Sequence, residues 1–153
     1  MAPTSLPRIV LADDDEIICS MLAAQLEGEF ECVGTAADAL GAVALALAER
    51  PDIVILDVEM PGGGAMHATS EIVSGAPDTA IVILSGDETR GAVIDLLEAG
   101  AITYLLKGIE APELVECLTL ALSAHQLEAQ RKLAAGIRPG TQGDAAATPQ
   151  TAA

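Results

Sequence analysis

The sequence has few basic residues. Lysine and arginine together number 7, against 23 aspartates and glutamates, which gives a formal net charge of −16. Seven scattered positive charges cannot build the basic surface with which proteins neutralise phosphate backbones. The same imbalance disfavours binding to anionic membrane surfaces. We therefore expect no direct contact with nucleic acid or with a membrane, and we expect the partners to be proteins.

Long apolar runs are also missing, although 51% of the residues are hydrophobic. No run approaches the roughly 18 apolar residues of a membrane-spanning helix, and residues 1–8 lack the apolar segment of a signal peptide. The three cysteines, Cys19, Cys32 and Cys117, are widely spaced and form no CxxC pair. Such thiols are typical of a reducing compartment, where they stay buried or idle. We expect a cytoplasmic protein.

The sequence does contain a regular alternation of short apolar segments with helical patterns. The apolar segments predict five strands, at about residues 8–12, 30–35, 52–56, 79–84 and 101–106. The intervening patterns predict helices at about residues 16–27, up to 50, 65–74, 88–99 and from 111 onward. Nearly apolar strands that alternate with single helices indicate a parallel sheet covered on both faces. We therefore predict an α/β fold in one domain, because 153 residues leave little room for two.

The ends of the chain differ from its middle. Residues 1–7 are predicted to be an N-terminal extension and residues 8–135 the folded domain. Residues 126–132, near the end of the last helix, are mostly polar and should extend beyond the sheet, where they could support a homodimer. Residues 136–153 consist largely of Gly, Pro, Ala, Thr and Gln, a composition that predicts a flexible tail.

Chemically active side chains stand where the predicted strands end. Asp57 ends the apolar run at residues 53–56 and precedes a glycine-rich turn. Three further strand ends carry Asp13-Asp14-Asp15, Ser85 and Lys107. Open α/β sheets bind ligands at the carboxyl ends of their strands, and converging carboxylates favour a hard cation such as Mg²⁺. Because an aspartate can accept a phosphoryl group covalently, this set of side chains predicts a phosphate site.

These residues resemble the motifs of the receiver domain of bacterial response regulators, over about residues 8–125. The motifs occur in order: Asp13-Asp14, Asp57 within Ile-Leu-Asp-Val-Glu-Met-Pro, Ser85 within Val-Ile-Leu-Ser-Gly, and Tyr104 and Lys107 within Tyr-Leu-Leu-Lys. The Pro61-Gly-Gly-Gly turn and the Tyr-Leu-Leu-Lys-Gly ending resemble the NarL/FixJ branch more than the chemotaxis branch. The resemblance implies a doubly wound, five-stranded parallel sheet of flavodoxin-like order 2-1-3-4-5 with five helices.

The resemblance also implies a function and a cofactor. Asp57 would accept a phosphoryl group from a sensor histidine kinase or a phosphotransfer protein. Mg²⁺ would be held by the side chains of Asp14 and Asp57 and by the main-chain carbonyl of Glu59, with Asp13 assisting through water. Phosphorylation would then change a protein-binding face. In a chain of this length we expect a single-domain regulator whose downstream target is a protein.

Three residues are expected to contact or sense the phosphoryl group. By the resemblance, Ser85 is the switch hydroxyl, Lys107 pairs with the phosphoryl oxygens, and Tyr104 changes rotamer together with Ser85. Each also has an ordinary structural interpretation, because Ser85 could begin a helix cap, Lys107 could be a solvated charge and Tyr104 could simply pack at a strand end. Asp15 is expected to cap the first helix.

Four positions around the site qualify the resemblance. Gly86 stands where the family more often has Ala, which would widen access to the phosphoryl group. Gly108 stands where many receivers have Pro, which puts the usual cis peptide in doubt. Glu59 and Asp87 flank the site at positions that tune autodephosphorylation in the family, and their acidity is compatible with ordering or repelling the attacking water.

Two other functions are compatible with parts of the sequence. The Asp13-Asp14-Asp15 run fits the DxD motif of haloacid dehalogenase-type phosphatases. Those enzymes also need an acidic pair after the lysine, but in this chain no Asp follows Lys107 until Asp144. A receiver-like binding module that switches without phosphorylation is the remaining alternative. The expected protein is a phosphoacceptor with at most slow autodephosphorylation, and not an enzyme.

Overall fold

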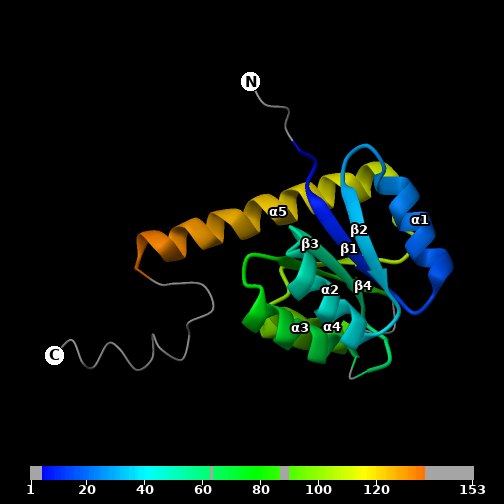
Figure 1. Cartoon of the computed structure of the whole chain (residues 1–153), viewed down its shortest axis with the longest axis horizontal. Helices are drawn as coiled ribbons and strands as arrows, with labels where there is room; N and C mark the ends of the chain where they lie inside the picture. The colour runs from blue at the N-terminus through cyan, green and yellow to red at the C-terminus, as the bar shows by residue number, and fades with distance from the viewer. Residues whose placement is uncertain (1–4, 63, 87–89, 137–153) are drawn as a thin grey trace.

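The computed structural model describes residues 5–62, 64–86 and 90–136, and within them five strands alternate with five helices (Figure 1). The elements in chain order are β1 (Arg8–Ala12), α1 (Glu16–Leu26), β2 (Glu31–Ala36), α2 (Ala39–Glu49), β3 (Ile53–Asp57), α3 (Gly64–Gly75), β4 (Ala80–Ser85), α4 (Arg90–Ala99), β5 (Thr103–Leu106) and α5 (Ala111–Ala134). The predicted α/β alternation is confirmed, and each observed boundary lies within a few residues of the predicted one.

The strands form one parallel sheet in the order β2-β1-β3-β4-β5, which confirms the predicted fold. In this order the chain moves outward in one direction from β1 to β2, and in the other direction from β3 to β5. The two directions separate between β1 and β3, whose last paired residues are Ala12 and Leu56. A ligand site of an open α/β sheet is expected at the carboxyl ends of these two strands.

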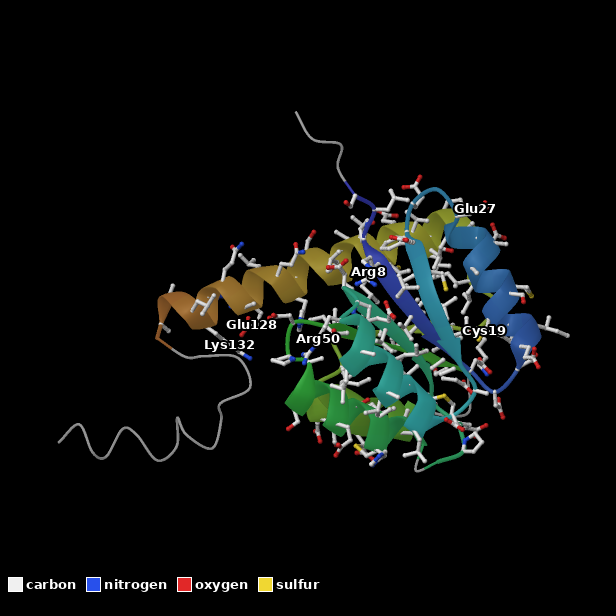
Figure 2. All side chains as sticks on the ribbon, viewed as in Figure 1. Arg8, Cys19, Glu27, Arg50, Glu128 and Lys132 are labelled. Carbon is white, nitrogen blue, oxygen red and sulfur yellow. The ribbon has the colours of Figure 1, made fainter. Side chains whose placement is uncertain are left out.

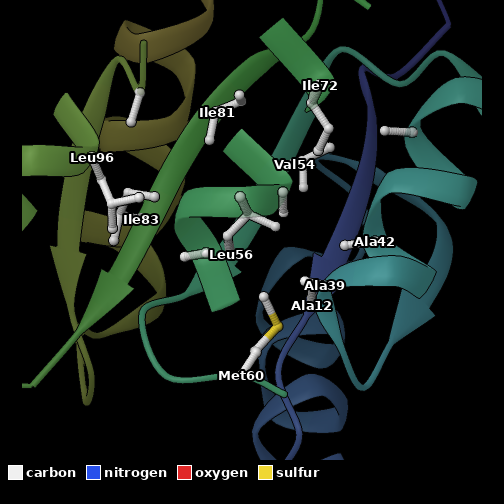
Figure 3. Packing of buried hydrophobic residues seen from close by; sticks show 14 of the residues in the cluster. Ala12, Ala39, Ala42, Val54, Leu56, Met60, Ile72, Ile81, Ile83 and Leu96 are labelled. Carbon is white, nitrogen blue, oxygen red and sulfur yellow. The ribbon is translucent and has the colours of Figure 1, made fainter. Parts of the chain in front are cut away.

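Two hydrophobic cores, one on each face of the sheet, explain why the strands are apolar throughout. One core joins the sheet to α2, α3 and α4, and the other joins it to α1 and α5. Figure 3 shows the first core, in which Val54 and Leu56 of β3 and Ile81 and Ile83 of β4 contact residues from the covering helices. All five residues of β3 and all six of β4 are buried, so neither strand has a polar side.

The helix ends show how far local sequence rules apply. The Asp15 carboxylate accepts a hydrogen bond from Ile17 N at 2.9 Å, so the predicted cap of α1 is confirmed. Gly28 and Gly100, which follow α1 and α4, adopt the positive φ angles of +89° and +131° that suit glycine. Arg50 ends α2 in the left-handed conformation, with φ +49°. No glycine marked that position in the sequence.

The last helix, α5, is 24 residues long and continues past the sheet, as the sequence predicted (Figure 1). Leu114, Leu118 and Ala121 of its first half are buried against the sheet. Glu128 and Lys132 lie on the projecting half (Figure 2). His125 of this helix is half-buried, and its Nε2 lies 3.0 Å from the Pro77 carbonyl oxygen. None of the helices in the described ranges has the length and apolar character needed to cross a membrane.

Candidate functional site

The predicted site residues meet at the carboxyl edge of the sheet. Asp13 directly follows β1, Asp57 and Ser85 are the last residues of β3 and β4, and Lys107 follows β5. Backbone hydrogen bonds continue past the strands and position these residues: Asp13 N donates to the Ala36 carbonyl at 3.0 Å, and Lys107 N donates to that of Ser85 at 2.9 Å. The fold therefore brings side chains from the ends of four strands to one edge of the sheet.

Three carboxylates lie close together at this edge. Asp13, Asp14 and Asp57 each present one carboxylate oxygen within 4.8 Å of the other two. Asp13 and Asp57 are only 3% exposed, whereas Asp14 is exposed to solvent. The sequence prediction that these residues converge is thus consistent with the geometry.

Burial raises the pKa of both Asp13 and Asp57 above the ordinary value for aspartate. A hydrogen bond from Asp15 N to Asp13 Oδ1 at 2.9 Å opposes this rise. The negative charges of the neighbouring carboxylates reinforce it at both residues. The site therefore holds more negative charge than its environment favours.

The only lysine or arginine that pairs with these carboxylates in the described ranges is Lys107. Its Nζ lies 2.9 Å from Asp57 Oδ1 and 3.8 Å from Asp13 Oδ2. Burial lowers the pKa of Lys107, but its hydrogen bond to Asp57 and the surrounding carboxylates outweigh that effect and raise the pKa overall. One ammonium group thus faces three carboxylates.

The donor set fits Mg²⁺. Oxygen ligands with open positions for water suit this ion, and Asp13 Oδ2 is buried without a hydrogen-bond partner in the described structure. A buried polar atom of this kind is rare unless an ion or a water occupies the space beside it. Asp13, Asp14 and Asp57 could therefore hold Mg²⁺. Glu59 is exposed two residues beyond Asp57, and its charge contributes to the raised Asp57 pKa.

The remaining predicted residues lie on the β4 and β5 side of the site. Ser85 is 2% exposed, and its hydroxyl donates to the Gly86 carbonyl oxygen at 3.2 Å. Tyr104 is 47% exposed and pairs with Ile83, two residues before Ser85. Ser85, Gly86 and Tyr104 line one apolar hollow together with α4. Asp87 lies outside the described residues.

The sequence missed a second hollow, which opens beside Lys107. It lies between α1 and the start of α5, and Met21, Ile109 and Pro112 contribute to its lining. Gln25 Nε2 donates to the Ile109 carbonyl oxygen at 3.3 Å across this junction. These residues are more than 80 positions apart in the chain, so no local pattern could have signalled their contact.

Comparisons with known proteins agree with this site. The family model described as the response regulator receiver domain matches residues 9–119. The transcriptional regulatory protein PdtaR of Mycobacterium tuberculosis is 39% identical over 126 residues, which cover 80% of this chain and 60% of PdtaR. LiaR of Bacillus subtilis, also a transcriptional regulatory protein, is 34% identical over 116 residues, which cover 74% of this chain and 55% of LiaR. The matched region thus spans little more than half the length of these relatives.

Solved structures give the same result. The signal receiver domain of the putative response regulator NarL from Mycobacterium tuberculosis superposes with a TM-score of 0.74 at 26% identity, covering 78% of this chain and 98% of that one. A two-component response regulator of the LuxR family from Aurantimonas is 31% identical with a TM-score of 0.72, covering 78% of this chain and 87% of that one.

Proposed function

Because this chain belongs to the family of response regulator receiver domains, we propose that it accepts a phosphoryl group on Asp57 from a sensor histidine kinase or a phosphotransfer protein. The observation that carries the proposal is the position of the Asp57 carboxylate, which is buried within 2.9 Å of Lys107 and beside Asp13 and Asp14. Asp13 is also buried beside acidic side chains, but its Oδ2 lies farther from Lys107 Nζ, at 3.8 Å.

The chemistry assigned to Asp57 is nucleophilic attack on phosphorus. One carboxylate oxygen of Asp57 forms the new P–O bond, while the P–N bond to the donor imidazole breaks and its electron pair returns to the ring nitrogen. When the Asp57 carboxylate becomes phosphorylated, Lys107 pairs with the phosphoryl oxygens, and the Ser85 hydroxyl can donate to one of them. The chemistry that Mg²⁺ supplies when bound is neutralisation of charge on the phosphoryl oxygens. Asp13, Asp14 and Asp57 would hold it, with the Glu59 carbonyl.

The proposed output is a change in a protein-binding surface. Ser85 and Tyr104 line the same hollow at α4 and β5, so a shift of the Ser85 hydroxyl toward a phosphoryl oxygen changes the space available to the Tyr104 ring. Because Tyr104 is half-exposed, its movement alters the surface that a partner protein meets. The strongly acidic composition supports a protein target rather than nucleic acid.

A phosphorylation assay with a matched control tests the proposal. Incubation with Mg²⁺ and acetyl phosphate should add one acid-stable, base-labile phosphoryl group per chain, detected by intact mass. Asp57→Asn should abolish the gain. Asp52→Asn should retain it, because Asp52 lies at the opposite end of β3 and accepts a hydrogen bond from Arg8 N at 2.8 Å.

Two results would contradict the proposal. A phosphoryl gain that persists in Asp57→Asn would place the acceptor elsewhere. A wild-type chain that gains no mass, and whose amide spectrum does not shift when Mg²⁺ and beryllofluoride are added, would favour the alternative of a binding module that works without phosphorylation.

A further inference from the structure

Helix α2 has an unusual composition for a surface helix. From Ala39 to Ala48 it contains ten residues in succession without a polar side chain, between Asp38 and Glu49. A helix that is apolar on all sides is normally buried on all sides. Yet α2 lies on the outside of the sheet, beside the edge strand β2, with one side open (Figure 1).

Three alanines of α2 face the core, Val43 and Leu45 pack at the margin of that core, and the other two leucines face outward. Ala39, Ala42 and Ala46 are fully buried, and Figure 3 shows Ala39 and Ala42 beside β1. In contrast, Leu40 is 63% exposed and Leu47 is 39% exposed. The alanines let α2 pack closely on the sheet. Leu47 also lies against Gly75 of α3 and Leu40 beside Gly62, but both leucines keep a large exposed surface. We call the outer side of α2, formed by Leu40, Gly41, Ala44, Leu47 and Ala48, the α2 stripe.

We propose that the α2 stripe binds the α2 stripe of a second copy of this chain, with the two helices antiparallel about Ala44. Leu40 precedes Ala44 by four residues and Leu47 follows it by three, so antiparallel pairing places Leu40 of one copy beside Leu47 of the other. The small residues Gly41, Ala44 and Ala48 allow the two helices to approach closely. A twofold axis repeats the same contacts on both copies, as is usual for homodimers.

Charge favours a second copy at this surface. At a net charge of −16, two copies repel each other through most of their surfaces, but the α2 stripe carries no charge. Asp38 stands at the N-terminal end of α2 and Arg50 at the C-terminal end. Antiparallel pairing brings the acidic end of each helix toward the basic end of the other, and it also opposes the two helix dipoles.

The exposed side of α5 is less suited to this role. Leu120 and Leu127 are exposed along it, at 63% and 55%, but charged residues interrupt the surface, including Glu116 and Glu128. Two copies paired through α5 would bring these carboxylates together. The uncharged α2 stripe is therefore better suited to self-association than α5.

The dimer is expected to be weak. A helix of 11 residues is about 16 Å long, and a pair of such helices buries less surface than the ~1,200 Å² at the low end of stable interfaces. We expect reversible association in the high-micromolar range. The inference goes beyond the proposed function and is independent of it, because it concerns the unphosphorylated chain.

Sedimentation equilibrium on the unphosphorylated chain, over a concentration series up to the millimolar range, tests the inference. The average mass of the wild type should rise toward that of a dimer. Leu40→Glu places a like charge inside the interface and should raise the dissociation constant at least about tenfold. The matched control is Leu120→Glu, because Leu120 has the same 63% exposure on another helix. Its dissociation constant should stay within about twofold of the wild type.

A cross-linking measurement identifies the surface directly. In a variant whose three cysteines are replaced by serine, Ala44→Cys should form a disulfide-linked dimer under mild oxidation, because both Ala44 residues lie at the proposed axis. Ala124→Cys on α5, also exposed, should not. Unchanged thermal midpoints would show that the variants fold. A wild type that stays monomeric throughout, or a dimer lost in Leu120→Glu and kept in Leu40→Glu, would overturn the inference.

Discussion

Charged side chains have different surroundings at the two edges of the sheet, the amino edge where the strands begin and the carboxyl edge where they end. At the amino edge, the Asp52 carboxylate accepts from Arg8 N at 2.8 Å, and the Arg8 guanidinium pairs with Glu49 at 2.7 Å. The Thr79 hydroxyl donates to the Pro51 carbonyl at 2.8 Å. The Arg8–Glu49 ion pair is partly solvated, and the Asp52 carboxylate has a backbone amide as its partner. Arg8, labelled in Figure 2, thus connects β1 to the end of α2.

At the carboxyl edge the charges are buried and poorly compensated. Asp13 and Asp57 are nearly inaccessible, one Asp13 oxygen accepts no hydrogen bond in the described structure, and Lys107 is shared between them. Buried polar groups that lack partners cost stability. The amino edge thus contributes to stability, whereas the polar groups of the carboxyl edge are incompletely satisfied, as expected where a ligand completes the site.

The largest effect should come from removing the lysine. Lys107→Met takes away the positive charge beside Asp57, so phosphorylation by acetyl phosphate with Mg²⁺ should slow about 100-fold. Arg8→Met, at the amino edge, should leave the rate unchanged. The rates are compared by intact mass over time. A similar loss in both variants would mean that the amino edge also affects phosphorylation and that the two edges are coupled.

Adding Mg²⁺ should stabilise the folded protein through residues of the carboxyl edge and not through those of the amino edge. Binding to the folded state at 100 times the dissociation constant stabilises a protein by about 2.7 kcal/mol, which urea unfolding with Mg²⁺ or with EDTA would detect. Asp14→Asn, which removes an exposed carboxylate from the cluster, should greatly reduce this gain. Asp52→Asn should retain it. An equal gain in the wild type and in Asp14→Asn would show that Asp14 is not a ligand.

Without Mg²⁺, the carboxyl edge should make stability fall as the pH rises. Burial raises the pKa of Asp13 and Asp57 above the ordinary value of 3.8. The folded state then holds their protons more tightly than the unfolded chain, so this contribution is fully present below that value. It is lost as the pH rises through the folded pKa.

Substitutions at the two ends of β3 distinguish the effect of the carboxyl edge on stability from that of the amino edge. In EDTA near neutral pH, Asp57→Asn should raise the free energy of unfolding by about 1 to 2 kcal/mol. Asp52→Asn should lower it by about 1 kcal/mol, because it weakens the hydrogen bond with Arg8. Urea unfolding between about pH 4 and pH 8 measures both effects. A destabilised Asp57→Asn would show that pairing with Lys107 outweighs the burial of the charge.

Much of the fold could be predicted because its signals are local. The apolar runs of β3 and β4 indicated strands buried on both faces, and Asp15 capped α1 as expected. The strand order came from the family resemblance and not from the composition. The end of α2 could not be predicted, because Arg50 is held in the left-handed conformation by the tertiary structure, in which its guanidinium donates to the Gly75 carbonyl at 2.7 Å.

The sequence could predict which side chains come together at the candidate site, but not how deeply each of them is buried. Strand ends located Asp13, Asp57, Ser85 and Lys107, because parallel strands all end at the same edge. The burial of the carboxylates and the unpaired Asp13 oxygen depend on the packing of loops that are distant in sequence. In the same way, residues 39–48 of α2 include no polar side chain that would mark its outer face, so the exposure of Leu40 could only be seen in three dimensions.

The smallest expected effect concerns two thiols near opposite edges. Cys19 of α1 is buried beside the carboxyl edge, where its thiol contacts the Asp13 carbonyl at 3.7 Å, and burial together with the Asp13 charge raises its pKa to about 11. Cys32 lies near the amino end of β2 and is exposed. Because only the thiolate reacts, iodoacetamide at pH 8 should alkylate Cys32 at least about tenfold faster than Cys19. Peptide mapping measures both rates, and denaturant should make them nearly equal. Equal rates in the folded protein would show that solvent reaches the carboxyl edge as freely as the amino edge.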